Sequence, residues 1–362
     1  MKYVISKQEG SPAYLQLYKQ LREDIVGGIY PFGAKLPSKR TIAEEVSVST
    51  ITVEHAYSLL CDEGYIEARE RSGYFNIFSR DDGFAGVKSE PTVIVRKDSI
   101  SHEEGQFPFS TLAKAMRSVI SEMGEGILER SENIGRKELR GAISRYLAAS
   151  RGIKASPSQI VVGSGSEYLY GLIVELIGRD KTFAIEAPSY KKIEQVYKAA
   201  DVVLEMLPLS HDGIDSRELK KSNADVLHIT PYRSFPSGVT ASASKRHEYV
   251  RWASRKGKYI VEDDFESEFS VSHKPEETVF SLSDNDNVIY MNSFSKTISP
   301  SMRVGYMVLP QNLAERFSEK LGFYSCTVPT FVQLLIAKLI LDGDFERHIN
   351  RVRRHKRRSL TK

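Results

Sequence analysis

The stretch Asn292-Ser-Phe-Ser-Lys-Thr-Ile-Ser-Pro-Ser-Met-Arg-Val-Gly305 contains a lysine and an arginine, Lys296 and Arg303, among small hydroxyl residues. It follows an apolar run that is typical of a strand, so we expect a loop at a strand end. A lysine in a polar but shielded loop can lose its proton and form an imine, because desolvation and nearby cations lower its pKa. Ser293, Ser295 and Arg303 could hold a dianionic phosphate by charge-assisted hydrogen bonds. By itself, the stretch is also compatible with a surface loop that carries a solvated lysine.

Three other segments supply groups that would complete such a site. Glu262-Asp-Asp-Phe-Glu-Ser-Glu268 ends a strand and offers a carboxylate, best Asp263, that could pair with a protonated pyridine nitrogen and keep the ring an electron sink. Gly163-Ser-Gly-Ser-Glu167 is typical of a strand–turn–helix corner, whose N–H groups can cradle a phosphate. Glu186-Ala-Pro-Ser-Tyr190 offers an aromatic face that could stack on the ring.

The part of the chain that contains these motifs alternates apolar runs with helical patterns. This alternation predicts an α/β domain with a mainly parallel, seven-stranded sheet covered on both faces, and it places ligand chemistry at the carboxyl ends of the strands. The strand candidates are Ile160–Val162, Phe183–Ile185, Val202–Leu207, Val226–Ile229, Tyr259–Val261, Val288–Met291 and Val304–Val308. The helical patterns include Lys137–Ala149, Glu167–Ile177, Lys191–Ala199 and Lys245–Arg255.

With Thr230-Pro-Tyr-Arg-Ser-Phe-Pro-Ser-Gly238, these motifs resemble the fold type I aminotransferase domain of the MocR subfamily of GntR-family regulators, from about Phe107 to the end of the chain. The resemblance implies pyridoxal 5'-phosphate as the cofactor, joined to Lys296 as an internal aldimine. It implies that Asp263 pairs with the pyridine nitrogen and that Tyr190 stacks on the ring. Lys192 lies near the position where relatives have a basic residue for the carboxylate of an effector. The implied phosphate site consists of Ser293, Ser295, Arg303 and the backbone of Ser166 and Glu167.

Three features depart from the family pattern. Phe265 stands where a tyrosine is common, and Phe235 where catalytic aminotransferases have an asparagine, for the phenolic oxygen of the cofactor. We therefore expect ligand sensing rather than catalysis, with at most residual transaminase activity. Residues 343–362 resemble the helix that leads into the family's small C-terminal domain, which this sequence lacks. The sequence is thus either a shortened member of the family or a fragment.

Residues 1–76 form a separate unit. Apolar spacing predicts helices at residues 14–25, 38–46 and 49–60, and two glycines then frame a hairpin. Helix, helix, turn, helix and hairpin are the order of a winged helix-turn-helix. The motifs from about Pro12 to Phe75 resemble the DNA-binding domain of the GntR family, whereas a protein-binding helical module is the less favoured alternative.

The resemblance implies DNA contacts where this unit groups its basic residues, at 35–40 and 69–71. Short hydroxyl side chains at a helix N-terminus can reach base edges, and the free N–H groups there favour phosphate. Thr50 stands where many relatives have an arginine, which leaves the sequence preference open. The implied contacts are Lys35, Lys39 and Arg40 with phosphates or groove edges, Ser49, Thr50 and Thr52 with the major groove, and Arg69, Arg71 and Gly73 at the wing tip.

Composition and spacing set the remaining expectations. The net charge of +4 allows a nucleic-acid partner without requiring one. The two cysteines give no disulfide framework, His348 and His355 have no carboxylate partner for a metal, and no apolar stretch is long enough for a membrane span. We therefore expect a cytoplasmic protein with a DNA-binding domain at 1–76, a linker at 77–106, a cofactor-binding domain at 107–342 and the beginning of an interrupted helix at 343–362.

These inferences combine into one hypothesis. The chain is expected to be a pyridoxal-phosphate-dependent transcriptional regulator of vitamin B6 or amino-acid metabolism, which binds operator DNA as a homodimer and senses a small amino compound or the cofactor itself. Alternatives are an active aminotransferase with an accessory DNA-binding domain, and a cofactor-free scaffold used for dimerisation. A dinucleotide site at Gly163-Ser-Gly-Ser-Glu-Tyr168 is a weaker alternative, because Tyr168 replaces the last glycine of that fingerprint.

Overall fold

The structure is a computed structural model that describes residues 3–6, 11–79, 106–255, 257–270 and 277–360. The chain divides into two compact units, Met1–Ile100 and Ser101–Lys362, and each has its own hydrophobic core. Most of the linker predicted at 77–106 lies outside the described residues. No helix in the described ranges is both long and apolar enough to cross a membrane.

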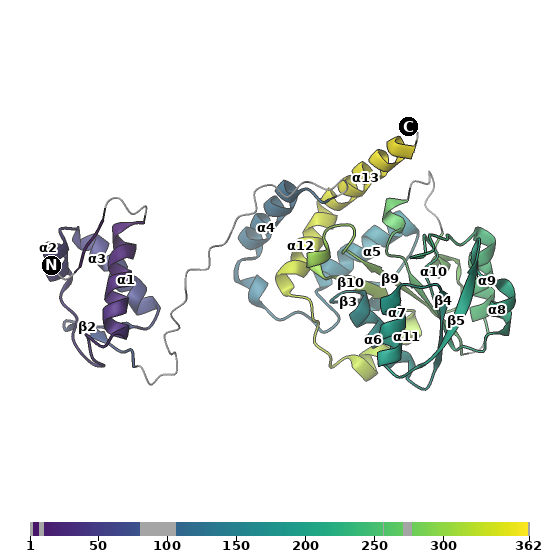
Figure 1. Ribbon diagram of the computed structural model, residues 1–362, viewed down its shortest axis with the longest axis horizontal. Coiled ribbons are helices and arrows are strands. Elements are labelled where there is room, and N and C mark those ends of the chain that lie inside the picture. Colours follow the sequence, from purple (N-terminus) through teal and green to yellow (C-terminus); the bar gives the residue numbers. More distant parts are fainter. Residues whose placement is uncertain (1–2, 7–10, 80–105, 256, 271–276, 361–362) are drawn as a thin grey trace. The chain divides into compact units, whose positions relative to one another are not determined.

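The N-terminal unit is a winged helix-turn-helix, as predicted (Figure 1). Ser38 and Ser49 cap its second and third helices, since each side chain accepts the backbone N–H of the residue three positions later. Leu17 and Leu21 of the first helix share a buried hydrophobic core with Tyr57 of the third. The elements are α1 (Ala13–Val26), α2 (Lys39–Val46), α3 (Thr50–Asp62), β1 (Ile66–Arg69) and β2 (Gly73–Asn76).

Within the described residues, the C-terminal unit contains an eight-stranded sheet with the strand order β3-β10-β9-β8-β7-β4-β5-β6. Neighbouring strands from β9 to β5 are parallel, whereas β10 is antiparallel to both β3 and β9. The mainly parallel sheet is thus confirmed, with one strand more than predicted. The extra strand, β6, has two residues, which are too few to produce a pattern of alternation. The strands are β3 (Ile160–Gly163), β4 (Thr182–Ala187), β5 (Val203–Ser210), β6 (Gly213–Ile214), β7 (Val226–Ile229), β8 (Tyr259–Asp263), β9 (Val288–Ser293) and β10 (Gly305–Val308).

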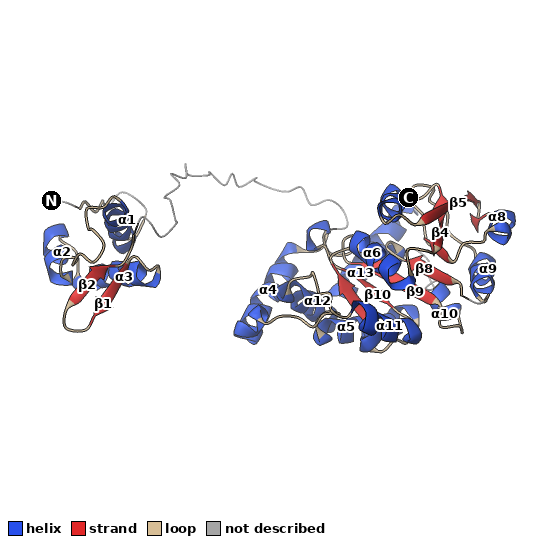
Figure 2. Cartoon of the chain, turned by 90° about the horizontal axis from the view of Figure 1, so that it is seen from below, coloured by secondary structure: helices blue, strands red, loops and turns tan. Residues whose placement is uncertain are grey.

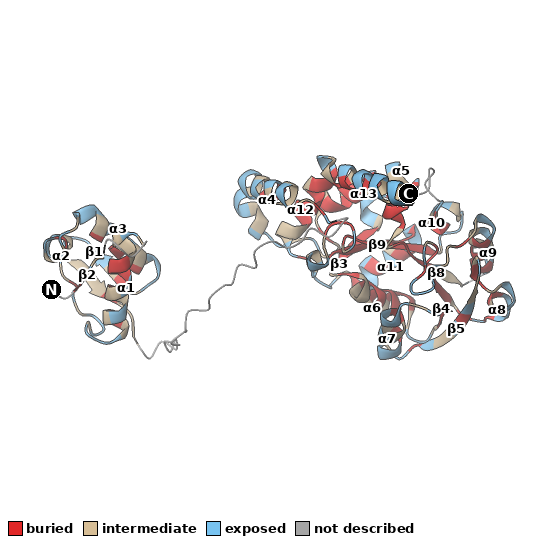
Figure 3. Cartoon of the chain, turned by 45° about the horizontal axis from the view of Figure 1, so that its top comes forward, coloured by how far each residue is buried: buried red, intermediate tan, exposed pale blue. Residues whose placement is uncertain are grey.

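Helices cover both faces of this sheet (Figure 2). Because successive side chains of a strand point to opposite faces, Ile260 of β8 packs in a core with the helix at 243–253, while Val261 packs with the helix at 166–177 on the other face. Burial on both faces explains why the strands read as continuous apolar runs. Figure 3 shows buried residues in the strands and on the inner sides of the helices.

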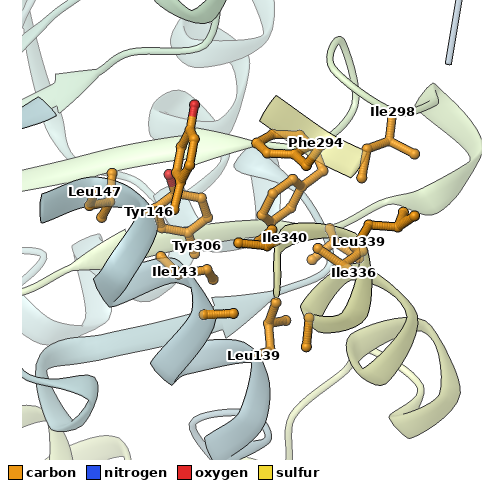
Figure 4. Close-up of a cluster of buried hydrophobic side chains, with 14 of the residues drawn as sticks. Leu139, Ile143, Tyr146, Leu147, Phe294, Ile298, Tyr306, Ile336, Leu339 and Ile340 are labelled. Carbon is orange, nitrogen blue, oxygen red and sulfur yellow. The ribbon is translucent and has the colours of Figure 1, made fainter. Parts of the chain in front are cut away.

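The helices of this unit are α4 (Phe109–Met123), α5 (Lys137–Arg151), α6 (Ser166–Ile177), α7 (Lys191–Ala199), α8 (Ser216–Lys221), α9 (Ala243–Ala253), α10 (Val279–Leu282), α11 (Gln311–Leu321), α12 (Thr330–Leu341) and α13 (Asp344–Leu360). Short 3-10 turns lie at η1 (Gly124–Leu128), η2 (Pro157–Gln159), η3 (Ser267–Phe269) and η4 (Pro300–Met302). Side chains of α5, α12 and β10 meet in a core that also holds the loop after β9 (Figure 4). This packing fixes the position of the loop that contains Lys296.

Candidate functional site

A cavity of about 290 Å³ is lined by residues at the carboxyl ends of β8 and β9 and at the amino end of α6. Parallel α/β sheets bind their ligands at this edge. The cavity brings together all the side chains predicted for the cofactor, together with the lysine predicted for an effector, from four separate segments of the chain. They are Ser166, Glu167, Tyr190, Lys192, Asp263, Ser293, Ser295, Lys296 and Arg303. Their binding roles stay predictions, but their proximity is a property of the fold.

Lys296 lies in the loop after β9, and buried side chains anchor this loop on both sides of it. Phe294 and Ile298 belong to the hydrophobic core beneath (Figure 4). The Lys296 Nζ is 3.1 Å from Glu266 Oε1 and 4.5 Å from the centroid of the Phe265 ring. The sequence left a shielded and a solvated lysine both open, and the side chain is 45% exposed among the described residues. The anchoring therefore fixes the position of Lys296 without removing it from water.

Of the two aspartates at the end of β8, Asp263 is the one that lines the cavity. The next residue, Asp264, approaches Arg151 instead, with 3.5 Å between its Oδ2 and Arg151 Nε, because successive residues at a strand end point to opposite sides. Asp263 is 3% exposed, and its Oδ2 accepts the hydroxyl of Tyr170. Its Oδ1 is buried and has no hydrogen-bond partner among the described residues. A buried polar atom without a partner is costly, so this oxygen fits a protonated ring nitrogen in the cavity.

We call the other end of the cavity, formed by Ser166, Glu167, Ser293, Ser295 and Arg303, the phosphate cup. The residue before α6, Gly165, has a φ of 101°, and a Cβ at this position would lie 2.8 Å from Arg303 Nη2. Arg303 has a φ of 50°, a left-handed conformation that costs a non-glycine residue energy and occurs often at functional sites. The amino end of α6 and the guanidinium therefore lie directly against each other, as binding a phosphate requires.

In this structure, the carboxylate of Glu167 pairs with Arg303 of the phosphate cup and with Lys192, another residue that lines the cavity. Its Oε2 is 2.8 Å from Arg303 Nη2, and its Oε1 is 2.8 Å from Lys192 Nζ. Partial burial by itself raises the pKa of Glu167, but the hydrogen bonds donated by Lys192 and Arg303 outweigh it and lower the pKa to about 2. The sequence predicted a role for the backbone of Glu167 and did not predict this role for its side chain.

Aromatic side chains form another part of the cavity wall. The rings of Tyr190 and Phe235 meet edge to face, with 6.0 Å between their centroids. Phe265 lies beside Lys296. Neither phenylalanine has a hydrogen-bond donor in its side chain, so neither can bind the phenolic oxygen of a cofactor. Both of these departures from the family pattern therefore fall within the cavity.

Next to the cavity, several buried acidic residues have raised pKa values. Burial raises the pKa of Glu186 to about 7. Burial and the charge of Asp264 raise the pKa of Glu262 to about 8, against the hydrogen bonds that its carboxylate accepts from two backbone N–H groups. Burial also raises the pKa of Glu268 to about 7, although the nearby Arg151 lowers it. These groups are therefore more easily protonated in the folded chain than in the unfolded one.

We expect the thermal unfolding midpoint to fall as the pH rises from about 6 to about 8.5, because a carboxyl whose folded pKa is raised stabilises the fold below its unfolded pKa and loses that contribution as pH passes through the folded pKa. The pKa values of Glu186, Glu262 and Glu268 place this loss between pH 4.5, the ordinary glutamate value, and pH 7 to 8, so the fall should level off above about pH 8. Circular dichroism across this range measures it. The variant Glu262→Gln should show a shallower fall, and a midpoint that rises with pH would contradict the assignment.

The amino ends of α2 and α3 present the helix residues predicted for DNA. Ser49 and Thr50 are exposed, and the Oγ1 of Thr52 is 2.8 Å from the Oγ of Ser49. Lys39 pairs with a carboxylate on α3 at 2.8 Å. Arg40, the next residue of α2, is exposed. Of these two basic residues of α2, Arg40 is therefore better placed than Lys39 to contact a phosphate.

The β1–β2 hairpin presents the other predicted DNA residues. Arg69 pairs with a carboxylate of its own strand at 2.5 Å. Arg71 is exposed at the tip with a φ of 58°. Gly73 has a φ of 111°, a backbone conformation that favours glycine, and a Cβ there would lie 3.0 Å from Lys35 Cε. The wing tip thus combines an exposed arginine with a tight backbone.

Sequence reasoning missed several residues of these two sites. Tyr170 lies one turn after the beginning of α6, on the side that faces Asp263, and helical spacing could have indicated it. His228 lies behind Asp263, with 3.8 Å between its Nε2 and Asp263 Oδ2, and its strand gave no signal beyond an apolar run. Glu266, the partner of Lys296, was not distinguishable from its acidic neighbours. Ile51 is 63% exposed on α3, where an apolar side chain can contact a thymine methyl group.

Comparison with protein families matches both units. Residues 98–361 match the family described as aminotransferase class I and II, and residues 13–75 match bacterial regulatory proteins of the gntR family. The first match covers well over half of the chain.

Curated relatives align along nearly the whole chain. It is 31% identical over 354 residues to YdeL of Bacillus subtilis, named an HTH-type transcriptional regulator, with 95% of this chain and 76% of YdeL covered. It is 28% identical over 375 residues to MocR of Rhizobium meliloti, named for the regulation of rhizopine catabolism, with 97% and 76% covered. It is 26% identical over 344 residues to PdxR of Corynebacterium glutamicum, named a pyridoxine biosynthesis transcriptional regulator, with 94% and 75% covered. The chain thus spans about three quarters of the length of these relatives.

Solved structures of aminotransferases are similar to the C-terminal unit. A kynurenine aminotransferase of Pyrococcus horikoshii gives a TM-score of 0.61 at 25% identity, over 68% of this chain and 64% of that one. A multiple substrate aminotransferase of Thermococcus profundus gives a TM-score of 0.62 at 24% identity, over 76% and 73%. The chain therefore spans less than two thirds of the length of the first of these enzymes. At 24% identity, the similarity to the Thermococcus profundus enzyme shows a shared fold and no more.

Proposed function

Because the chain belongs to the MocR subfamily of GntR-family transcriptional regulators, we propose that its aminotransferase-like domain binds pyridoxal 5'-phosphate and controls how the N-terminal domain binds operator DNA. The observation that carries this proposal is the meeting of Lys296, Asp263 and Arg303 in one cavity, with a buried Asp263 oxygen that has no partner among the described residues. Most buried polar atoms have a hydrogen-bond partner, so an unpartnered oxygen on a residue that lines a cavity supports a ligand there.

Each part of the cavity has a separate task in this proposal. When bound, the cofactor supplies an aldehyde that reacts with primary amines and a ring that withdraws electrons. Lys296 would hold it covalently, and Asp263 would accept the ring N–H. Ser293, Ser295, Arg303 and the amino end of α6 would bind the phosphate. Tyr190 would limit the motion of the ring, and the hydrogen bond from Tyr170 would hold Asp263 in orientation.

We infer that the domain senses a ligand rather than turning it over. Phe235 and Phe265 line the cavity without a hydrogen-bond donor for the phenolic oxygen. Lys192 provides an exposed cation for the carboxylate of an amino-compound effector. Incubation with common amino acids should therefore give no sustained production of keto acid. Multiple turnovers with any of them would instead favour the second candidate function, an aminotransferase with an accessory DNA-binding domain.

The regulated genes would belong to vitamin B6 or amino-acid metabolism. PdxR is named for pyridoxine biosynthesis, and a regulator that binds pyridoxal phosphate can report the supply of that vitamin. The effector, whether a small amino compound or the cofactor, can change DNA affinity only by binding one arrangement of the protein more tightly than another.

We propose that the chain acts as a homodimer. Large apolar side chains are exposed on α4, on η1 and in the turn after α11, among them Phe109, Leu128 and Phe323. Exposed apolar side chains that gather in one patch are typical of association surfaces. Light scattering during size-exclusion chromatography should give the mass of two chains, and a monomer at micromolar concentration would contradict the proposal.

DNA binding is tested by the double substitution Arg40→Ala and Arg71→Ala. We expect weaker binding to a duplex selected from a random-sequence pool, and a salt slope reduced by roughly 0.9 for each lost phosphate contact. Both arginines are exposed, so the fold should persist. Fluorescence anisotropy at several salt concentrations measures the effect. Lys19→Ala, which removes an exposed charge from α1, should leave affinity unchanged. An unchanged slope in the double variant would contradict the assigned DNA face.

A further inference from the structure

The phosphate cup contains an anion that belongs to the chain itself. Glu167 Oε2 lies 2.8 Å from the Nη2 of Arg303, the residue assigned to the phosphate. Its Oε1 lies 2.8 Å from Nζ of Lys192, the residue assigned to an effector. One carboxylate thus satisfies the two cations that a phosphorylated ligand and a carboxylate ligand would each use.

The position of Glu167 in the fold strengthens this arrangement. Glu167 is in the first turn of α6, a helix of 12 residues, where a negative charge interacts favourably with the helix dipole and with free N–H groups. These are the same groups that would bind a phosphate. The hydrogen bonds from Lys192 and Arg303 lower the pKa of Glu167 to about 2, against the effect of partial burial, so the carboxylate is charged at any physiological pH. Protonation therefore cannot release the two cations, and another anion has to displace the carboxylate.

We propose that Glu167 is a built-in competitor for the phosphate of the ligand, which weakens the binding of pyridoxal phosphate and keeps the site reversible. The inference rests on the proposed function, since it concerns the same cavity. A phosphate that enters the cup must displace the carboxylate of Glu167 from Arg303 or remain beside this like charge. Either event lowers the affinity of the site for the phosphate. A regulator with such a site responds to the free concentration of the phosphorylated compound, whereas a site without the competitor would stay loaded.

The substitution Glu167→Gln tests this proposal, because it removes the charge and keeps the shape. We expect pyridoxal phosphate to bind about tenfold more tightly at low salt, the size of one charge-assisted hydrogen bond partly screened by solvent, and the gain to shrink as salt rises. Pyridoxal, which has no phosphate, should bind both proteins equally. The matched control is Glu175→Gln, at the other end of α6, where the carboxylate pairs with the exposed Arg179. This control should bind like the parent protein.

A second probe separates this proposal from the assignment of the cofactor. Inorganic phosphate should raise the unfolding midpoint of Glu167→Gln more than that of the parent protein, and this comparison does not depend on Lys296. If neither protein forms a covalent adduct with pyridoxal phosphate, the cofactor assignment is wrong, and the phosphate comparison still decides the role of Glu167. Three results would overturn the competitor role. The first is that the two proteins bind pyridoxal phosphate equally, and the second is that pyridoxal gains as much affinity from the substitution as pyridoxal phosphate does. The third is that inorganic phosphate raises the two unfolding midpoints equally. Glu167→Ala should reproduce the gain if glutamine distorts the helix.

Discussion

Replacing Lys296 by alanine is expected to abolish the visible absorption band that pyridoxal phosphate gives when it is joined covalently to the chain. Lys296 lines the same cavity as Asp263, whose Oδ1 has no partner among the described residues, and its loop is anchored by buried Phe294 and Ile298. Without its amine, the site keeps the ring and phosphate contacts and loses the covalent bond. A spectrum of each protein with added cofactor measures the loss, which should be complete.

The location of the adduct is checked independently of the spectrum. Reduction of the parent protein with borohydride, followed by peptide mass spectrometry, should find the label on Lys296. Lys198→Ala is a matched control, because Lys198 is exposed on α7 and pairs with Glu194 outside the cavity. This control should keep the full band. A band of equal strength in Lys296→Ala, or a label spread over several lysines, would mean that the cavity is not the cofactor site.

Replacing Arg151 by methionine is expected to lower the free energy of unfolding by about 3–5 kcal/mol, the cost of leaving a buried charge without its partner. Arg151 ends α5 and is buried between Asp264 at 3.5 Å and Glu268 at 4.0 Å. It also donates a hydrogen bond to Ser267. Methionine fills a similar volume and removes the charge, so both carboxylates would remain buried without a cation.

The pH dependence distinguishes this explanation from a simple packing defect. In the variant, loss of Arg151 raises the carboxyl pKa values further, so the destabilisation should be greater at pH 8 than at about pH 5.5, where the folded carboxyls are protonated. Chemical denaturation at the two pH values measures it. Adding Asp264→Asn should restore part of the lost stability. Arg145 is exposed on the same helix, so the control substitution Arg145→Met should change the free energy of unfolding little. A loss independent of pH would indicate packing rather than charge.

The recognisable chemistry of this protein lies in short stretches. The loop with Lys296 and Arg303, the strand end with Asp263 and the turn before α6 each have a local pattern, because a strand, a tight turn and a helix cap depend on neighbouring residues. The apolar runs predicted the mainly parallel sheet for the same reason. The winged helix-turn-helix followed from helical spacing and from the serines that cap α2 and α3.

Other features were not predictable from local patterns. The two-residue β6 has too few residues to alternate. The sequence favoured Asp263 over Asp264, and the tertiary structure supplies the physical reason, because Asp263 lines the cavity whereas Asp264 approaches Arg151. The exposure of Lys296 depends on how far the neighbouring loops extend over it, and the sequence left a shielded and a solvated lysine both open.

By itself, then, the sequence determined the two units, the order of their elements and the residue types available for a phosphate, a ring nitrogen and a covalent bond. The tertiary structure decided which of these groups meet. Arg303 and Glu167 are far apart in the chain and form an ion pair at 2.8 Å, and Arg151 meets Asp264 across a similar separation. Charge pairing and burial depend on distances in space, and periodicity along the chain carries no information about residues so far apart. For this reason the cofactor residues could be predicted from the sequence, while the anion that already pairs with them could be found only in the folded chain.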